Sequence, residues 1–175
     1  LIGSGVDFVY DSTRFTAGAG ANFTGALLRV ASAAPVISNV TLNGDGVRVL
    51  ADNTLLAGFD VLGATRDGLS ILNAQGTQLQ SFTSNSNGRH GYYALTNDGV
   101  SRTVSFENLS TSNNGGSGIW VEANGLGHWS DVGLRNIVST GNAQQGVYVL
   151  AQSSGQHVSA KLQDFTEKGN AQQGV

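Results

Sequence analysis

One seven-residue phrase occurs twice in this chain. Residues Gly141–Val147 read Gly-Asn-Ala-Gln-Gln-Gly-Val, and Gly169–Val175 repeat them letter for letter, at an offset of 28 residues. A fixed period of this length is typical of repeat architectures, in which each repeat buries its apolar face only against its neighbours. The repeat therefore constrains the fold more strongly than the composition does.

A glycine followed by alternating apolar residues recurs upstream of this phrase. We call these residues the anchor glycines; they are spaced 21 to 28 residues apart and comprise a weaker one at Gly25, then Gly46, Gly68, Gly91, Gly118, Gly146 and Gly174. The first and third positions after the anchor are apolar, from Val47 and Val49 in one repeat to Val147 and Val149 in another. This alternation predicts a strand with one buried face.

A second strand is predicted before each anchor glycine. The ninth position before the anchor carries Ile37, Phe59, Phe82, Leu109, Ile137 and Phe165. The twelfth position, from the next repeat onward, carries Leu56, Leu79, Phe106, Leu134 and Leu162. The fourth position before the last four anchors carries Asn87, Asn114, Asn142 and Asn170. Because Asn tolerates left-handed backbone and bonds to its own turn, we expect this column to form a ladder at a corner of the coil.

Short strands turned by Gly and Asn resemble the right-handed parallel β-helix of the pectate-lyase-like superfamily. Thr65–Ile71 and Asn87–Tyr92 are phrases typical of its repeats, and the resemblance runs from about Pro35 to Val175. Leucine-rich repeats have similar lengths, but their Leu-x-x-Leu-x-Leu frame is absent. The resemblance implies an all-β, right-handed, single-stranded parallel β-helix, a solenoid of about six to seven coils of 21–28 residues.

The domain organisation follows from the same pattern. We expect residues 1–34 to form a first coil or cap, with strands from Val6–Tyr10 and a flexible loop at Thr16–Thr24. Residues 35–175 then form the coils of the β-helix. Because the last repeat stops at its anchor glycine and Val175, which leaves a coil face uncapped, we expect further coils to follow in the natural protein.

Composition narrows the classes of function. Only 12% of the residues are charged, and nine Lys and Arg are scattered singly in a chain of net charge −3, so no nucleic-acid-binding surface is predicted. No apolar run approaches the ~18 residues of a membrane helix. The chain has no Cys, which excludes disulfides, thiolate metal sites and a cysteine nucleophile. We expect no cofactor, with calcium as the one metal to consider.

Stacking of coils brings distant residues together, because equivalent positions of successive coils lie ~4.8 Å apart. The second position after the anchor points outward and carries Tyr93, Trp120 and Tyr148 in three consecutive coils, which we call the aromatic row. Such a row fits the apolar faces of a sugar chain. Trp129, in the Gly-rich insertion at residues 124–130, is expected either to overhang this row or to pack in the interior. Alternatively, these rings only stabilise the sheet, by roughly 0.2–1 kcal/mol per pair.

A polar column lies beside the anchor glycines. Asp45, Asp67 and His90 directly precede three successive anchors, and Arg66 and Arg89 stand one position earlier. Two carboxylates one coil apart raise each other's pKa or recruit a cation such as Ca²⁺, and a neighbouring His can relay a proton. Arginines there suit a uronate or a developing oxyanion. The column resembles those of lyases and epimerases of the superfamily, but the Asp-Pro-His-Glu motif of alginate epimerases and further calcium ligands are absent. Alternatively, these are solvated turn residues.

Three functions remain open from the sequence. The main expectation is a non-catalytic, secreted or cell-surface β-helix of a bacterial autotransporter passenger or adhesin, which binds a polysaccharide or a cell-surface glycan or protein through the aromatic row. The first alternative is a polysaccharide lyase, hydrolase or epimerase that uses Asp67 and His90 with Arg66 and Arg89. The second alternative is a segment of a phage tailspike, which would be trimeric.

Overall fold

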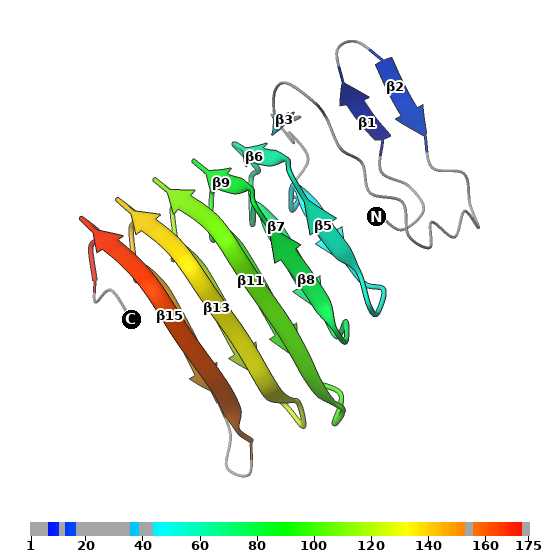
Figure 1. Ribbon diagram of the computed structural model, residues 1–175, viewed down its shortest axis with the longest axis vertical. Coiled ribbons are helices and arrows are strands. Elements are labelled where there is room, and N and C mark those ends of the chain that lie inside the picture. Colours follow the sequence, from blue (N-terminus) through cyan, green and yellow to red (C-terminus); the bar gives the residue numbers. More distant parts are fainter. Residues whose placement is uncertain (1–6, 11–12, 17–35, 39–43, 153–155, 173–175) are drawn as a thin grey trace.

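The computed structural model describes residues 7–10, 13–16, 36–38, 44–152 and 156–172. All regular structure in these ranges is β-strand. The described residues contain no helix that could span a membrane. Strands of successive coils lie side by side in sequence order (Figure 1). The prediction of an all-β parallel solenoid is therefore confirmed.

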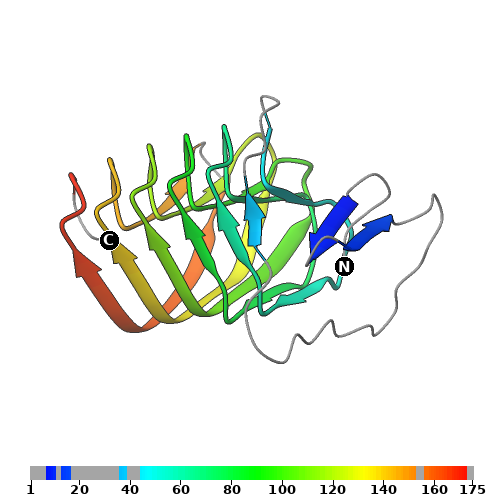
Figure 2. The same ribbon diagram turned by 90° about the horizontal axis from the view of Figure 1, so that it is seen from above.

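Each coil contributes strands to two parallel sheets, and the coils follow one another along the molecule (Figure 2). The short-strand sheet consists of β4 (Val47–Val49), β7 (Leu69–Leu72), β10 (Tyr92–Thr96), β12 (Ile119–Ala123) and β14 (Val147–Ala151). The long-strand sheet consists of β3 (Val36–Ser38), β5 (Leu55–Ala57), β6 (Asp60–Leu62), β8 (Thr77–Gln80), β9 (Thr83–Asn85), β11 (Ser101–Ser112), β13 (His128–Thr140) and β15 (Val158–Lys168).

The observed register follows the columns of the sequence. In the short-strand sheet the residues after the anchors pair in the order Val47, Leu69, Tyr92, Ile119, Val147. In the long-strand sheet the twelfth position pairs in the order Leu56, Leu79, Phe106, Leu134, Leu162. The placement of Ile37 level with Phe59 is wrong, because Ile37 pairs with Val61. A shift of two residues preserves the face of a strand, so Ile37 still packs on the core.

The described residues make about four turns of the solenoid. The six to seven expected coils include those of Gly25 and Gly174, which lie outside the described residues. Near the N-terminus, β1 (Asp7–Tyr10) and β2 (Thr13–Thr16) pair antiparallel and form a separate two-stranded sheet, so these strands do not extend the parallel sheets. The loop predicted at Thr16–Thr24 lies outside the described residues after Thr16.

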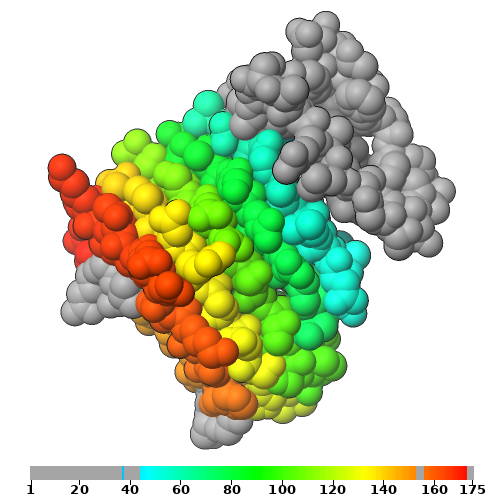
Figure 3. All heavy atoms as spheres, in the orientation of Figure 1, coloured from blue at the N-terminus to red at the C-terminus, as the bar shows by residue number. Residues whose placement is uncertain are grey.

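The interior of the coils is filled by stacked apolar side chains. The rings of Phe59 and Phe82 stack at 4.7 Å, and Tyr92 meets Phe82 edge-on at 5.5 Å. The buried hydroxyl of Tyr92 lies 3.1 Å from the carbonyl oxygens of both Phe82 and Ser110, so it has an acceptor inside the core. In the space-filling view the coils form adjoining bands without gaps between them (Figure 3). Burial of each coil therefore depends on its neighbours.

Two columns of left-handed residues set the corners of the coils. Ten positions before the anchors, φ is 52° to 73° at Gly58, Ser81, Asn108, Asn136 and Asp164. Five positions before the anchors, φ is 54° to 69° at Gly63, Ser86, Asn113, Gly141 and Gly169. Gly, Asn and Asp adopt left-handed backbone at least cost, and Ser81 and Ser86 occupy these corners in the coil of Gly91. The asparagines predicted for this conformation, such as Asn87 and Asn114, stand one position later and do not adopt it.

The asparagine column forms the predicted ladder, which is a buried chain of hydrogen bonds between coils. The backbone N and Nδ2 of Asn87 donate to Oδ1 of Asn114 at 3.0 and 2.9 Å, and Asn114 donates to Asn142 at 3.1 and 2.9 Å. Each Nδ2 also donates to a hydroxyl three residues earlier, on Ser84, Thr111 and Ser139 in successive coils. Buried amides are tolerated here because their donors and acceptors are satisfied.

The anchor glycines are required by close approach of the coils. A Cβ on Gly46, Gly68, Gly91 or Gly118 would lie 2.6 to 2.7 Å from the carbonyl oxygen of the next anchor glycine. None of these four residues has a positive φ. Their common property is therefore the missing side chain, and the high glycine content of the chain reflects both this contact and the left-handed corners.

Candidate functional site

The predicted stacking of the aromatic row is confirmed on the outer face of the short-strand sheet. Tyr93 pairs with Trp120, and Trp120 pairs with Tyr148. The ring centroids of Trp120 and Tyr148 are 4.6 Å apart. The ring of His90 lies 4.9 Å from Trp120 and 5.8 Å from Tyr93, so it links the two rings. All three members of the row are partly exposed. Together they form a nearly continuous surface of rings across three coils.

A carboxylate that the sequence analysis missed holds two of these rings. Oε2 of Glu122 accepts hydrogen bonds from the Tyr93 hydroxyl and from Nε1 of Trp120, both at 3.1 Å. Burial, followed by the charge and hydrogen bond of Glu122, raises the pKa of Tyr93, so its phenol stays a donor. Glu122 pairs with Leu95 and Leu150 in a column of leucines four positions after the anchors. That break in the column is the signal that could have identified it.

The polar column before the anchors forms a second ladder. Oδ1 of Asp67 accepts the backbone N–H of His90 at 3.1 Å, and Nδ1 of His90 accepts the backbone N–H of Ser117 at 3.0 Å. Arg89 completes the contacts of the fully buried Asp67 with a bidentate ion pair. The structure thus brings Asp67, His90 and Arg89 together. However, each of the two expected catalytic side chains contacts backbone of the next coil, and the hydrogen bond between Asp67 and His90 uses the main chain of His90.

The environment of His90 keeps its imidazole neutral. Burial lowers its pKa to about 4, with the charge of Asp67 opposing and that of Arg89 adding to the shift. Because Nδ1 accepts a backbone hydrogen bond, the single ring proton is assigned to Nε2. The Arg89 guanidinium lies 4.7 Å from the centroid of the Tyr93 ring, a cation–π contact. At neutral pH, the positive charge beside the row therefore belongs to Arg89 and not to His90.

The expected calcium pair is occupied by protein groups. Oδ2 of Asp45 accepts hydrogen bonds from Ser70 at 2.7 Å and from Arg48 at 2.9 Å, and Arg66 lies 3.8 Å from Oδ1. Burial alone would raise the pKa of Asp45, but the bonds from Ser70 and Arg48 and the charges of Arg48 and Arg66 lower it overall. Asp67 is paired with Arg89. Within the described ranges, no three His, Asp or Glu side chains converge on a metal position.

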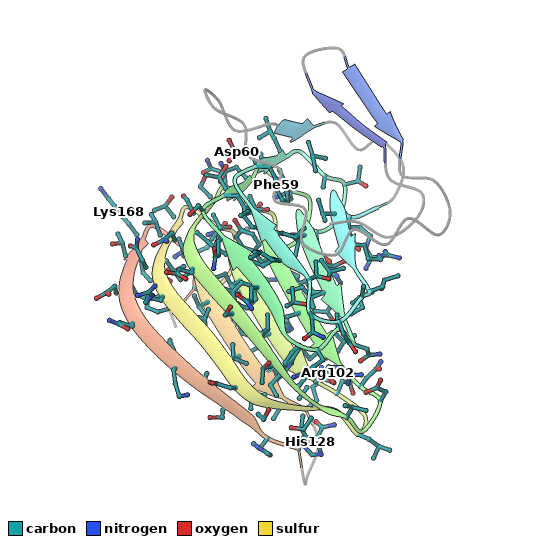
Figure 4. The ribbon with its side chains drawn as sticks, turned by 45° about the vertical axis from the view of Figure 1, so that its right-hand side comes forward. Phe59, Asp60, Arg102, His128 and Lys168 are labelled. Atoms are coloured by element: carbon teal, nitrogen blue, oxygen red, sulfur yellow. The ribbon has the colours of Figure 1, made fainter. Side chains whose placement is uncertain are left out.

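Trp129 does not overhang the aromatic row. Its side chain is fully buried, and its Nε1 donates to the carbonyl oxygen of Glu122 at 2.9 Å. The expectation that Trp129 contacts a glycan is therefore wrong. Trp129 lies near the start of β13, pairs with Arg102 and Val158 in the neighbouring coils, and is part of the core. Figure 4 shows Arg102 and the neighbouring His128 at the end of the long strands that lies away from Asp60.

One hollow of about 240 Å³ lies on the long-strand sheet, away from the predicted site. It is lined by carboxylate, hydroxyl, amide and apolar groups of four coils, among them Asp60, Thr83, Asn108 and Asn136. Asp60 and Thr83 bond to each other at 2.7 Å, and Asn136 donates to Asn108 at 2.8 Å. Their polar groups thus largely satisfy one another.

No protein-family model, curated protein or solved structure matches this chain. The structure establishes a parallel β-solenoid as the class of fold. The similarity to the pectate-lyase-like superfamily and to autotransporter passengers rests on the sequence patterns alone.

Proposed function

We propose that this chain is a non-catalytic, secreted or cell-surface β-solenoid that binds a polysaccharide or cell-surface glycan through Tyr93, Trp120 and Tyr148. The observation that carries the proposal is the row of partly exposed rings, with Trp120 and Tyr148 at 4.6 Å and His90 between Trp120 and Tyr93. Successive coils repeat at ~4.8 Å, and sugar rings present apolar faces that stack on such side chains.

The hydrogen bonds behind the row support binding more than a purely structural role. Glu122 holds Tyr93 and Trp120 in fixed orientations, which lowers the conformational entropy that a ligand would have to remove. Leu95 and Leu150 stand at the level of Glu122, in the strands on either side of it. A carboxylate placed between them is not needed for packing, and its two aromatic donors give it a specific use.

Catalysis by Asp67 and His90 has weaker support. A general acid or base must reach the substrate with a proton or a free lone pair. Asp67 is fully buried and paired with Arg89, while Nδ1 of His90 already accepts a backbone N–H. These bonds explain both residues as parts of the polar ladder, so we do not assign a reaction to them.

Replacement of Trp120 by Ala tests the proposal. Retention should be measured by affinity electrophoresis in gels that contain starch, xylan, alginate or hyaluronan, with the thermal midpoint recorded in parallel. We expect Trp120→Ala to weaken binding about 30-fold, as for a Trp worth about 2 kcal/mol at the centre of an interface. Trp120→Phe, which keeps a ring, should retain most of the binding.

Leu162→Ala is the matched control, because Leu162 is an exposed apolar residue of β15 on the other sheet. It should leave retention unchanged. If Trp120→Ala lowers the thermal midpoint sharply, and retention falls only as much as the loss of folded protein explains, the row is structural. If the wild-type protein binds none of these polysaccharides and no glycan on a glycan array, glycan binding is refuted.

A further inference from the structure

Four Asn-Gly dipeptides occur in the chain, and the structure treats them differently. Asn43 lies outside the described residues, which leaves Asn87-Gly88, Asn114-Gly115 and Asn124-Gly125. In such dipeptides the glycine nitrogen can attack the side-chain amide of the asparagine, because glycine has no side chain to hinder the approach. Whether this reaction occurs in a folded protein depends on how firmly both groups are held.

The first two dipeptides are held by the asparagine ladder. Asn87 and Asn114 are buried, and their amide groups bond within their own coil and to the next one. The backbone N–H of Gly88 donates to Ala64 O, and that of Gly115 donates to Asn87 O, both at 2.8 Å. Attack by either nitrogen would first require these bonds to break.

Asn124-Gly125 lies in the turn between β12 and β13, and the backbone N–H of Gly125 is not held by a carbonyl oxygen of another coil among the described residues. Asn124 is partly exposed, and the backbone N–H of Gly125 donates to the side-chain Oδ1 of Asn124 at 2.6 Å. The nitrogen therefore already lies against the amide group that it would attack. Gly125 has a φ of 57°, so its backbone occupies a conformation that glycine adopts easily.

We propose that Asn124 is a site of spontaneous deamidation that acts on the aromatic row. The nitrogen of Gly125 loses its proton to hydroxide and bonds to Cγ of Asn124. The Cγ–Nδ2 bond then breaks, and ammonia leaves with a proton from water, which gives a cyclic imide. Water opens the imide at Cγ to give aspartate, or at the backbone carbonyl to give isoaspartate. The net reaction consumes one water, releases one ammonia, and involves no oxidation or reduction.

The product changes the group that holds the aromatic row. Nδ2 of Asn124 donates to Oε1 of Glu122 at 3.3 Å, while Oε2 of the same carboxylate holds Tyr93 and Trp120. Deamidation replaces this donor with a second carboxylate, which repels Glu122. Rotation of Glu122 would release both rings. This consequence rests on the proposed function, whereas the chemical step does not.

Peptide mapping by mass spectrometry tests the chemical step on the full chain. The protein is incubated in mildly alkaline buffer for several weeks, and aspartate and isoaspartate are quantified at each dipeptide. We expect Asn124 to deamidate at least about tenfold faster than Asn87 and Asn114, because their ladder bonds must open first. In denaturant all three should react at similar rates. Equal rates in the folded protein would overturn the proposal.

Two variants test the consequence for binding. Asn124→Asp supplies the product charge, and Asn124→Gln keeps an amide that forms a cyclic imide far more slowly. On the polysaccharide that retains the wild type, we expect Asn124→Asp to bind about tenfold more weakly than Asn124→Gln, which changes the same position without adding a charge. Normal binding by Asn124→Asp would refute the coupling to the row. If no polysaccharide retains the wild type, the proposed function fails, while the mass spectrometric result still decides whether Asn124 deamidates.

Discussion

At the scale of single residues, His90 illustrates how the coil assigns a role to a side chain. One column of the coils contains Asp45, Asp67, His90 and Gln145. Each of these side chains accepts a hydrogen bond from a residue of a neighbouring coil. An imidazole fits this column only when Nδ1 carries no proton. The position therefore selects the neutral form of His90, and its pKa falls to about 4.

This pKa predicts an acid-sensitive contribution to stability. The unfolded chain binds a proton on His90 as the pH falls through the ordinary value of 6.5, whereas the folded protein does so only near 4. The contribution is present above pH 6.5 and is lost between these values, up to about 3 kcal/mol. Denaturant unfolding should therefore give similar stabilities for wild type and His90→Gln above pH 6.5, because Gln occupies the same column at Gln145. As the pH falls from 6.5 to about 4, the wild type should lose stability relative to His90→Gln.

A comparison of variants is needed because Glu167 acts in the opposite sense. Burial raises the pKa of Glu167 from 4.5 to about 7, so its contribution is present in acid and is lost as the pH rises through this range. The difference between wild type and His90→Gln cancels that contribution. Parallel profiles for wild type and His90→Gln would contradict the assignment.

The sequence analysis identified columns more reliably than conformations. It placed Asn87 and Asn114 correctly at a corner but assigned them the left-handed backbone that Ser86 and Asn113 adopt. Asn113 and Asn114 are adjacent and of the same type, so the pattern does not show which of them takes such backbone. Only the bonds to adjacent coils decide which residue turns inward. Glu122 was missed because its role depends on Tyr93 and Trp120, which reach it from other positions.

At the scale of elements, the anchor glycines allow the starts of paired strands in successive coils to lie close together. A Cβ on Gly118 would lie 2.6 Å from the carbonyl oxygen of Gly146 and 2.4 Å from Oγ of Ser139. Backbone on one side and the hydroxyl column on the other leave little freedom to adjust. The short-strand sheet can therefore form its regular pairing only where the side chain is absent.

Gly118→Ala should destabilise the protein by about 3 kcal/mol or more, because the added methyl group forces β12 away from β14. Chemical denaturation measures the loss. Gly133→Ser is the control within β13: a Cβ there meets only Cβ of Ser105 at 3.7 Å, and Ser105 is its partner in the same column. We expect a change within about 0.5 kcal/mol for this variant. Similar losses in both variants would show that the anchor position has no special restraint.

At the scale of the whole molecule, stability depends on contacts between neighbouring coils. The strands β11 and β13 each pair on both sides, and β13 alternates buried residues with partly or fully exposed ones through much of its length. The strand β15 pairs with β13 alone among the described strands, and most of its residues are exposed. A solenoid of this kind need not open as one unit.

Hydrogen exchange should therefore vary along the solenoid. For this 175-residue chain, we expect amides of β11 and β13 to exchange at least about tenfold more slowly than those of β15. Mass spectrometry with peptide-level resolution measures this difference. Uniform protection across the three strands would indicate a single cooperative unit and would contradict the expectation.

The sequence by itself determined the class of fold, the period, and which residues share a column, because each coil must repeat the pattern that buries its neighbour. It also placed Tyr93, Trp120 and Tyr148 in one row. Only the tertiary structure decided how those columns are used. In the folded protein Trp129 is buried, and Asp67 and His90 form hydrogen bonds of the polar ladder. Glu122 accepts a hydrogen bond from Trp120 of the row and another from Asn124. The physical reason is that periodicity fixes the level of a residue, whereas its hydrogen-bond partners depend on the side chains that adjacent coils bring to that level.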